Sequence, residues 1–379
     1  MAARDVDEGA LKIASIGPLA PHRGGIAHYH SLLCRALART HDVTGIGFTR
    51  LYPDLLFPGR TQLDESGTAI DFAGPRVVDS VDPRTWVRAA QRVRALSPDR
   101  LVFQWWHPFF APSFDTIAAL SRRAEGPRVV FVCHNVAPHE GARATRAVTS
   151  LALRAADAFI VHAESERREL EALVPDRPVV VHPHPPYDVF TSGGVPSRDD
   201  AKRALGLEGD VLLFFGLVRA YKGLLTLLDA LPAVLAHRRV TLVVAGEFYD
   251  DRAPYEARLD AGLRDRVVVH DRYIANEDVA RYFAAADVVV QPYLHATQSG
   301  VSQVAFACER PVIATRTGGI PDAIADGETG LLVPPDDPRA LADAIVRFFD
   351  EGLGPRMERA LRARTPPTWD GLARAVVEI

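Results

Sequence analysis

The sequence predicts an α/β protein built from two doubly wound parallel sheets, each in its own domain. Short runs of β-branched and apolar residues alternate with amphipathic stretches along the whole chain, which is typical of strands that alternate with helices. The runs are apolar almost throughout, as in parallel strands covered on both faces. A chain of 379 residues is also long enough for two domains of ordinary size.

Each half of the chain is expected to hold six strands, separated by helical stretches. In the first half the expected strands begin at Leu11, Asp42, Arg100, Arg128, Ala158 and Pro178. In the second half they begin at Val211, Val240, Arg266, Asp287, Pro311 and Gly330. The regular alternation in both halves predicts two Rossmann-like sheets.

A boundary between the domains is predicted near residues 183–200, in the linker-like segment HPHPPYDVFTSGGVPSRDD. This segment combines prolines, paired glycines and acids without any periodicity, as linkers do. The expected domains are therefore residues 1–188 and 189–364. A short helical pattern after Trp369 predicts a separate C-terminal helix in residues 365–379, which is expected to return to the N-terminal domain.

The composition excludes several classes of protein. A formal net charge of −4 gives no sign of polyanion binding, so nucleic acid is not an expected partner. The three cysteines, Cys34, Cys133 and Cys308, are scattered, which argues against a zinc site or a disulfide framework. No apolar run approaches the roughly 20 residues needed to span a bilayer, and the N-terminus lacks a secretory pattern. A cytoplasmic location is therefore expected.

The segment from Gly216 to Gly223, GLVRAYKG, is the first candidate for chemistry. It follows a buried strand and precedes a helix, so Arg219 and Lys222 are expected beside backbone N–H groups that favour anions. Two cations at this spacing suit a diphosphate. A pair of solvated surface bases is the alternative. Lys222 is one of only three lysines in the chain, which favours the functional interpretation.

Gly24 and Gly25 form a second candidate, because they open a helix after the first expected strand. Glycines at such a turn let the backbone approach a phosphate or a sugar closely. The segment does not match GxGxxG, so a dinucleotide fingerprint is absent. Paired glycines are also common in ordinary loops, and alone they are weak evidence.

Two histidines, His107 and His134, follow expected strands of the first half. Ligands of open α/β sheets gather at the carboxyl ends of strands, which favours a role for both. A histidine satisfied within the core is the alternative for each. The neighbouring Trp105 and Trp106 are expected either in the core or, for one of them, stacked on a sugar.

A polar loop of small residues, Ala296 to Gly300, leads from an expected strand into a helix, and Gly318 and Gly319 form a second turn of this type. The N–H and hydroxyl groups of such loops bind phosphates or sugars. Ordinary capping explains either loop alone but not their joint position at strand ends.

Taken together, these motifs resemble glycosyltransferase family 4, whose members are retaining enzymes of the GT-B fold. The resemblance runs in order through the paired glycines, His134-Asn135, the string G-L-x-R-x-x-K-G, the triplet at 245–247 and PVIAT…GGIPDAI.DGETGLLVPP. It implies two Rossmann-like domains that face a cleft, the first binding an acceptor and the second a nucleotide-sugar.

The resemblance also implies roles for individual residues. Arg219 and Lys222 would bind the donor diphosphate and stabilise it as the leaving group, and His134 would contact the donor sugar. The remaining donor-binding candidates are Gly24, Gly25, Glu247, Tyr273, Ile274, Thr297, Gln298, Ser299 and Gly300, with the backbone at Tyr273 and Ile274 reading the base. His107 and Asn135 are candidates on the acceptor side.

One departure from the family pattern concerns two glutamates eight residues apart, which normally contact the donor sugar and the ribose. Counted back from Pro311, their places fall at Ala296 and Val304, or one residue later at Thr297 and Ala305. Neither register supplies a carboxylate. Glu309 stands where the family usually has glycine. These changes leave ribose recognition and donor identity open.

The implied reaction needs no cofactor and no metal ion. The acid pairs Asp250-Asp251 and Asp336-Asp337 are interpreted as solvated turns and not as metal ligands. Three alternatives remain. The first is a pseudo-transferase that keeps the scaffold for binding. The second is another enzyme of this fold, such as a nucleotide-sugar epimerase, which would require acid–base carboxylates that cannot be located in the sequence. A nicotinamide oxidoreductase is disfavoured by the missing GxGxxG.

The sequence does not identify the acceptor. A glycan, a lipid-linked intermediate and a small molecule are all compatible with the motifs found. The apolar segment LYPDLLFPGR, from Leu51 to Arg60, is interpreted as ordinary packing in preference to a lid or a lipid-facing edge. Arginines cluster nearby, at Arg76, Arg84, Arg88, Arg92 and Arg94. Such a cluster is compatible with peripheral binding to an anionic membrane, and equally with solvated helix faces.

Overall fold

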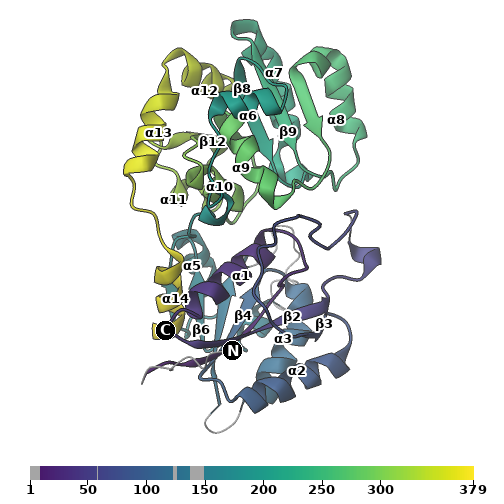
Figure 1. Ribbon diagram of the computed structural model, residues 1–379, viewed down its shortest axis with the longest axis vertical. Helices are drawn as coiled ribbons and strands as arrows, with labels where there is room; N and C mark the ends of the chain where they lie inside the picture. Colours follow the sequence, from purple (N-terminus) through teal and green to yellow (C-terminus); the bar gives the residue numbers. More distant parts are fainter. Residues whose placement is uncertain (1–8, 58, 123–125, 137–148) are drawn as a thin grey trace. The chain divides into compact units, whose positions relative to one another are not determined.

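The computed structural model describes residues 9–57, 59–122, 126–136 and 149–379, which divide into two units (Figure 1). The first unit runs through Glu65, continues from Ala69 to Pro185 and ends with Pro367–Ile379. The second unit contains Ser66–Thr68 and Pro186–Pro366. The main crossing, at Pro186, lies within the proline-rich segment that suggested a linker.

The first unit is built on a seven-stranded sheet in the order β3-β2-β1-β4-β5-β6-β7, with every pairing parallel. Its strands are β1 (Lys12–Ile16), β2 (Asp42–Arg50), β3 (Arg76–Asp79), β4 (Arg100–Trp105), β5 (Arg128–Cys133), β6 (Ala158–Val161) and β7 (Val179–Val181). Strand β6 is buried throughout and β5 is buried after its first residue, which explains their apolar runs.

The described helices of the first unit cover both faces of this sheet. They are α1 (Gly25–Leu37), α2 (Pro83–Leu96), α3 (Ala111–Ser121), α5 (Glu164–Glu171) and α14 (Trp369–Glu378), with short 3₁₀ turns η1 (Asp54–Leu56) and η2 (Pro108–Phe110). The C-terminal helix α14 packs against α1, sharing a core with Tyr29 and Leu33. Trp105 and Trp106 both belong to the core on the other face, so neither is available to stack on a sugar.

The second unit contains a six-stranded parallel sheet in the order β10-β9-β8-β11-β12-β13. Its strands are β8 (Asp210–Phe215), β9 (Val240–Ala245), β10 (Val267–His270), β11 (Val288–Gln291), β12 (Val312–Thr315) and β13 (Gly330–Val333). Its helices are α6 (Arg198–Ala204), α7 (Leu224–His237), α8 (Ala253–Arg258), α9 (Asn276–Ala285), α10 (Gly300–Ala307), α11 (Ile320–Ala323), α12 (Pro338–Asp350) and α13 (Leu353–Ala363), with 3₁₀ turns η3 (Asp188–Phe190) and η4 (Ala220–Lys222). Among the described helices of either unit, none is long and apolar enough to cross a membrane.

The strand orders confirm the predicted fold class, because both sheets are doubly wound. The order reverses between β1 and β4 in the first unit and between β8 and β11 in the second. Ligands of open α/β sheets bind outside the carboxyl ends of the strands at such a switch point. A ligand site is therefore expected in the loops that follow these four strands.

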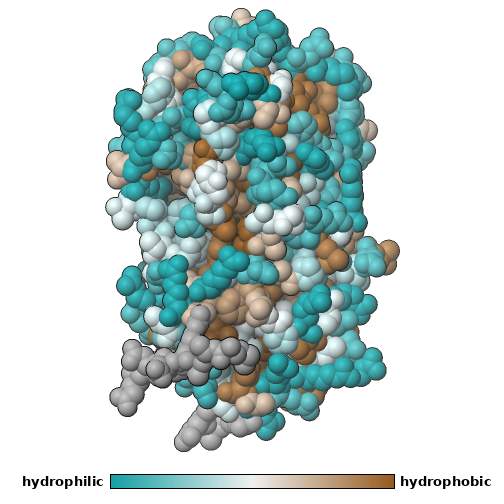
Figure 2. All heavy atoms as spheres, viewed as in Figure 1, coloured by the Kyte–Doolittle hydropathy of each residue, from teal (hydrophilic) through white to brown (hydrophobic). Residues whose placement is uncertain are grey.

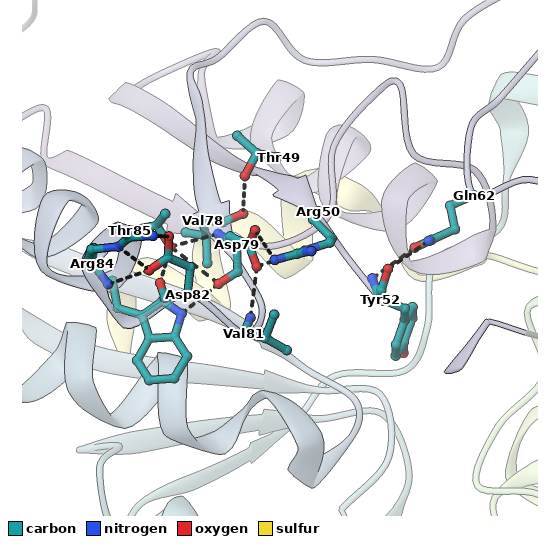
Figure 3. A network of polar contacts seen from close by, with 11 residues as sticks. Thr49, Arg50, Tyr52, Gln62, Val78, Asp79, Val81, Asp82, Arg84 and Thr85 are labelled. Atoms are coloured by element: carbon teal, nitrogen blue, oxygen red, sulfur yellow. Dashed lines mark hydrogen bonds and ion pairs between the residues drawn. The ribbon is translucent and has the colours of Figure 1, made fainter. Parts of the chain in front are cut away.

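The edge strand β3, at residues 76–79, was not expected, because its four residues RVVD carry no long apolar run. A polar network holds it beside β2 and α2 (Figure 3). Arg50 donates from Nε to Oδ1 of Asp79 at 3.1 Å, and Trp86 Nε1 donates to the Asp79 carbonyl at 2.7 Å. Side-chain bonding of this kind is not visible in a hydropathy pattern.

The interpretation of residues 51–60 as ordinary packing is wrong for two leucines. Leu55 is 96% exposed and Leu56 is 58% exposed. The segment that contains them is the purple loop at the right-hand edge of Figure 1, and brown spheres stand out at the same edge in Figure 2. The base of the loop is nevertheless fixed. The Tyr52 N–H donates to Gln62 Oε1, and Gln62 Nε2 donates to the Tyr52 carbonyl, both at 2.9 Å.

Candidate functional site

The switch point of the second unit brings together the two loops with the strongest sequence motifs. The loop after β8 carries Arg219 and Lys222, and the loop after β11 runs into α10. They contact each other directly, since the Leu294 N–H donates to the carbonyl of Tyr221 at 2.7 Å. The position predicted for the cation motif, between a buried strand and a helix, is the position that the structure shows.

Arg219 and Lys222 are both half-buried and lie over aromatic rings. The Arg219 guanidinium carbon is 4.9 Å from the centre of the Tyr249 ring, and Lys222 Nζ is 5.7 Å from that of Tyr293. Within the described part of the chain, neither cation has an acidic side chain at ion-pair distance. Two positive charges thus share one turn without an internal counter-ion.

The environment of Lys222 weakens its hold on a proton. Burial, followed by the nearby charge of Arg219, lowers the pKa of Lys222 from its usual value to about 8. An anionic ligand placed between the two cations would offset this repulsion. Two adjacent positive charges of this kind can hold a group with more than one negative charge.

Gly223 is required where the cation turn meets the loop after β11. Its φ of 68° lies in the left-handed region, and a Cβ atom there would lie 1.9 Å from the carbonyl oxygen of Pro292. Only glycine permits this approach of two backbones. Helix α7 begins at the next residue, so its N–H groups point toward the same switch point.

The loop 296–300 is tied to the two neighbouring loops rather than standing alone. The carbonyl of Thr297 accepts the N–H of Gly319 at 2.7 Å, which joins it to the glycine turn after β12. Ser299 caps α10 by accepting the N–H of Ser302. Thr297 and Ser299 are buried, and Gln298 and Gly300 are half-buried. The predicted donor-binding loop is therefore held by its cap and by its contact with the turn after β12.

The places of the two family glutamates are occupied by buried apolar or hydroxyl side chains in either register. Ala296, Val304 and Ala305 are all buried. Glu309 has a φ of 57°, a left-handed conformation that favours glycine. Its carboxylate forms an ion pair with Arg362 of α13 at 2.5 Å, away from the loop.

The remaining donor-side candidates follow neighbouring strands of the same sheet. Glu247 follows β9 and is buried, and its carbonyl accepts the N–H of Val218 at 2.9 Å, next to the cation turn. Tyr273 is half-buried and Ile274 buried, in the segment between β10 and α9. All these residues therefore lie at the carboxyl edge of the second sheet.

In the first unit, Gly24 and Gly25 stand at the start of α1, after the loop that follows β1. Gly24 caps the helix with a φ of 103°, and a Cβ atom there would meet nothing within 4 Å. The backbone of Gly24 is therefore open to a neighbour, and its conformation favours glycine.

His134 lies directly after β5, as predicted, and is held by a residue that the sequence did not single out. Its Nε2 is 2.9 Å from Oε1 of the buried Gln104 in β4. Because a carboxamide oxygen only accepts, this contact places the imidazole proton on Nε2. Burial, together with the nearby His162, His184 and His30, holds the pKa of His134 well below its usual range, so the ring is neutral.

Further histidines surround Tyr29 on the same edge of the sheet. The Tyr29 hydroxyl is 2.9 Å from Nε2 of His162, whose Nδ1 lies 2.7 Å from the carbonyl of His182. The Tyr29 ring also meets His184 and Trp369 of α14, with centroids 5.1 Å apart in each case. The neighbours of His134 are thus a packed layer of aromatic rings.

The two acceptor-side candidates have different surroundings. His107 is exposed, and its Nδ1 accepts the N–H of Phe109 at 3.1 Å as the cap of η2. Asn135 is half-buried, and its Nδ2 is 3.3 Å from the carbonyl of Trp106. Both follow strands β4 and β5 at the same edge as His134. No cluster of three or more metal-binding side chains occurs among the described residues.

Sequence reasoning missed one contact at the cation turn. Asp250, interpreted as part of a solvated turn, accepts the N–H of Ala220 through its Oδ2. Its neighbour Asp251 fits the original interpretation, since it accepts the N–H of Ala253 at 3.1 Å within its own turn. The two acids lie 30 and 31 residues beyond Ala220, and nothing in their spacing distinguishes them.

Two family models match the chain, one in each unit. Residues 23–185 match the model described as Glycosyltransferase Family 4, and residues 209–351 match the model described as Glycosyl transferases group 1. The two matches cover most of the chain. They include Gly24, His134, the cation turn and the loop 296–300.

Curated relatives carry the name D-inositol 3-phosphate glycosyltransferase. That of Corynebacterium glutamicum is 31% identical over 208 residues, covering 52% of this chain and 50% of the relative. That of Streptomyces scabiei is 35% identical over 243 residues, covering 60% of this chain and 54% of the relative. The chain thus spans about half the length of the curated relatives it matches.

Solved structures extend the similarity of the fold to nearly the whole chain. Sucrose-phosphate synthase from Thermosynechococcus elongatus matches with a TM-score of 0.72 at 21% identity, covering 97% of this chain and 98% of that one. HepE of Anabaena in complex with UDP matches with a TM-score of 0.74 at 17% identity, covering 97% and 99%. The chain belongs to glycosyltransferase family 4 and has the GT-B fold.

Proposed function

We propose that this protein is a retaining glycosyltransferase that moves a sugar from a UDP- or GDP-linked donor to an acceptor hydroxyl. The observation that carries the proposal is the pair Arg219 and Lys222, two half-buried cations at the switch point of the second sheet. No carboxylate of the described residues neutralises them. A diphosphate has the charge and the size to do so.

In the proposed reaction, the bond between the sugar C1 and the diphosphate breaks while a bond from C1 to the acceptor oxygen forms on the same face. The acceptor proton passes to the departing diphosphate. Arg219 and Lys222 offset the charge that develops on the leaving group, an effect that grows where water is excluded. Backbone N–H groups at the start of α7 add to the same stabilisation.

His134 would contact the donor sugar as a neutral ring. Its Nε2 proton is engaged by Gln104, and its pKa lies well below the usual range. The ring would therefore orient sugar hydroxyls by hydrogen bonding and contribute no positive charge. On the same unit, the donor would also contact Gly24 and Gly25. The acceptor would contact His107 and Asn135.

Transfer without a divalent metal ion forms part of the proposal. Cations that stabilise a leaving diphosphate are supplied here by two side chains, in the place where other enzymes use a metal. Two acids that follow β9 already accept backbone N–H groups, Asp250 that of Ala220 and Asp251 that of Ala253.

A binding protein that has lost transfer is a second candidate, favoured by one observation. Neither register of the glutamate pair supplies a carboxylate, and the residues there are Ala296, Thr297, Val304 and Ala305. A carboxylate forms stronger hydrogen bonds to ribose and sugar hydroxyls than neutral groups do. Its loss would weaken donor binding, transfer or both.

The test is a panel of UDP- and GDP-sugars, assayed by calorimetric binding and by release of nucleoside diphosphate, with and without EDTA. The acceptors include D-inositol 3-phosphate, because the relatives carry that name. We expect one nucleotide series to bind and to turn over equally well in EDTA. Binding without turnover for every pair would favour the binding protein, and no binding at all would contradict both candidates.

A further inference from the structure

The cation turn is held in place by the segment that follows β9. The ladder between β8 and β9 continues beyond both strands as a parallel bridge between Val218 and Phe248. The Val218 N–H donates to the carbonyl of Glu247 at 2.9 Å, and the Tyr249 N–H donates to that of Val218 at 3.0 Å. The residue before Arg219 is thus fixed on both sides by residues 247–249.

Asp250 extends this support into the turn itself. Its carboxylate accepts the N–H of Ala220, the residue that directly follows Arg219 and opens η4. The preceding residue, Tyr249, lies under the Arg219 guanidinium. One short segment therefore holds the backbone of the turn and the side chain of its first cation.

The geometry of this contact separates positioning from charge neutralisation. Asp250 bonds a backbone N–H and forms no ion pair with Arg219 or Lys222. A carboxylate that caps the first N–H groups of a helical turn fixes their direction. Asp250 can therefore fix the backbone between Arg219 and Lys222 while both positive charges stay available to a ligand.

We propose that Asp250 is a positioning residue for the diphosphate site, acting through the Ala220 N–H to hold Arg219 and Lys222 at the spacing that a nucleoside diphosphate requires. This inference rests on the proposed donor-binding function. It assigns a purpose to an exposed acid that neither the family resemblance nor the sequence pattern marks.

The chain offers a matched control in Asp251. Both acids are exposed and both accept one backbone N–H, but Asp251 serves its own turn, through Ala253. Asp250→Ala removes the acceptor, whereas Asp250→Asn keeps an oxygen that accepts the same N–H and removes only the charge. Substitutions at exposed positions rarely unfold a protein, and thermal melting checks this for each variant.

The experiment measures calorimetric affinity for UDP and GDP, together with kcat and the donor KM on the active donor. For Asp250→Ala we expect the affinity for the preferred nucleotide to fall by about fivefold or more, the size of a lost capping contact. The donor KM should rise more than kcat falls. Asp250→Asn should restore affinity to within about twofold, and Asp251→Ala should match the wild type.

The outcomes separate this inference from the proposed function. If the wild type binds no nucleoside diphosphate, the donor site itself is wrong. If the wild type binds and Arg219→Ala weakens binding, but Asp250→Ala does not, the donor site stands and the positioning role is wrong. Equal losses in Asp250→Ala and Asp250→Asn would also overturn it, because charge rather than the accepting oxygen would then matter.

Discussion

A Cβ atom on Gly216 would lie 3.1 Å from Nζ of Lys222. Because glycine has no side chain, this position directly after β8 leaves room for the ammonium group. Gly216 also has a φ of 92°, which disfavours other residues. Gly216→Ala should therefore displace Lys222, and we expect donor affinity to fall about tenfold by calorimetry.

Gly209→Ala is the matched control for this substitution. Gly209 has a φ of 66°, and a Cβ atom there would meet nothing within 4 Å. It should lose about 1 kcal/mol of stability from backbone strain and keep its donor affinity. Equal affinity losses in the two variants would show that backbone strain, and not contact with Lys222, is responsible.

Removing either cation should impair transfer far more than it impairs folding. Arg219→Ala and Lys222→Ala are each expected to reduce kcat/KM by roughly two orders of magnitude, as when one group that stabilises developing charge is removed. Circular dichroism and thermal melting should stay close to the wild type, because both side chains are half-buried and unpaired with acids. Near-normal kcat/KM in both variants would refute the diphosphate assignment.

Donor binding should weaken at alkaline pH. Lys222 has its pKa lowered to about 8, so the ammonium form that attracts a diphosphate is lost as the pH rises through about 8 rather than through the usual lysine range. Calorimetry with the preferred nucleotide from pH 7 to pH 9.5 measures this. Lys222→Arg keeps its charge over the whole range and should remove the alkaline loss. A loss that persists unchanged in that variant would come from another group.

Much of the fold was predictable because most of the twelve expected strands carry largely apolar runs, and parallel strands buried on both faces require such runs. The missed strand β3 lies at the sheet edge and depends on contacts to Asp79. The exposed Leu55 and Leu56 were also misjudged, since hydropathy alone does not show that a loop projects.

The candidate site was predictable where it follows strand ends, as with Arg219 and His134. The supporting contacts were not. The bond from the Ala220 N–H to Asp250 joins residues 30 positions apart, and the bond between Gln104 and His134 joins two different strands. Both depend on which strands become neighbours, and the strand order arises only from the folded sheet.

The first unit should lose stability in mild acid because several of its histidines are buried as neutral rings. Burial lowers the pKa of His30 to about 4, that of His162 to about 3 and that of His184 to about 4. Below about pH 6.5 the unfolded chain binds protons that the folded rings do not, so stability should fall from about pH 6.5 down to about pH 4 for His30 and His184, and to about pH 3 for His162. Above pH 6.5 both states are neutral, and these groups should have no effect.

Urea denaturation at pH 7.0, 6.0 and 5.0 tests this acid dependence. The control is the double substitution His162→Gln and His184→Gln, in which two titrating groups are replaced by neutral amides. This variant should show a smaller change in unfolding free energy between pH 7.0 and pH 5.0 than the wild type. The same pH dependence in both proteins would mean that other groups cause the loss.

The loop that replaces the glutamates should bind the donor through neutral groups. Gln298→Ala is expected to weaken nucleotide-sugar binding by about fivefold, the size of one neutral hydrogen bond. Gly300→Val should have a larger effect, for a reason that the structure makes specific. A Cβ atom on Gly300 would lie 3.3 Å from Cε2 of the buried Tyr187, so valine would push against this ring as well as crowd the start of α10.

Two further variants separate these causes by calorimetry with UDP, GDP and their sugars. Gly300→Ala adds only the Cβ atom and should show a partial loss. If the clash with Tyr187 dominates, the double variant Gly300→Val with Tyr187→Ala should recover affinity relative to Gly300→Val alone, because the ring that valine displaces is gone. If it does not recover, the added methyl groups act on the N–H groups of α10, where the ligand is expected. Unchanged affinity in both Gln298→Ala and Gly300→Val would make the loop structural and would favour a binding role over transfer.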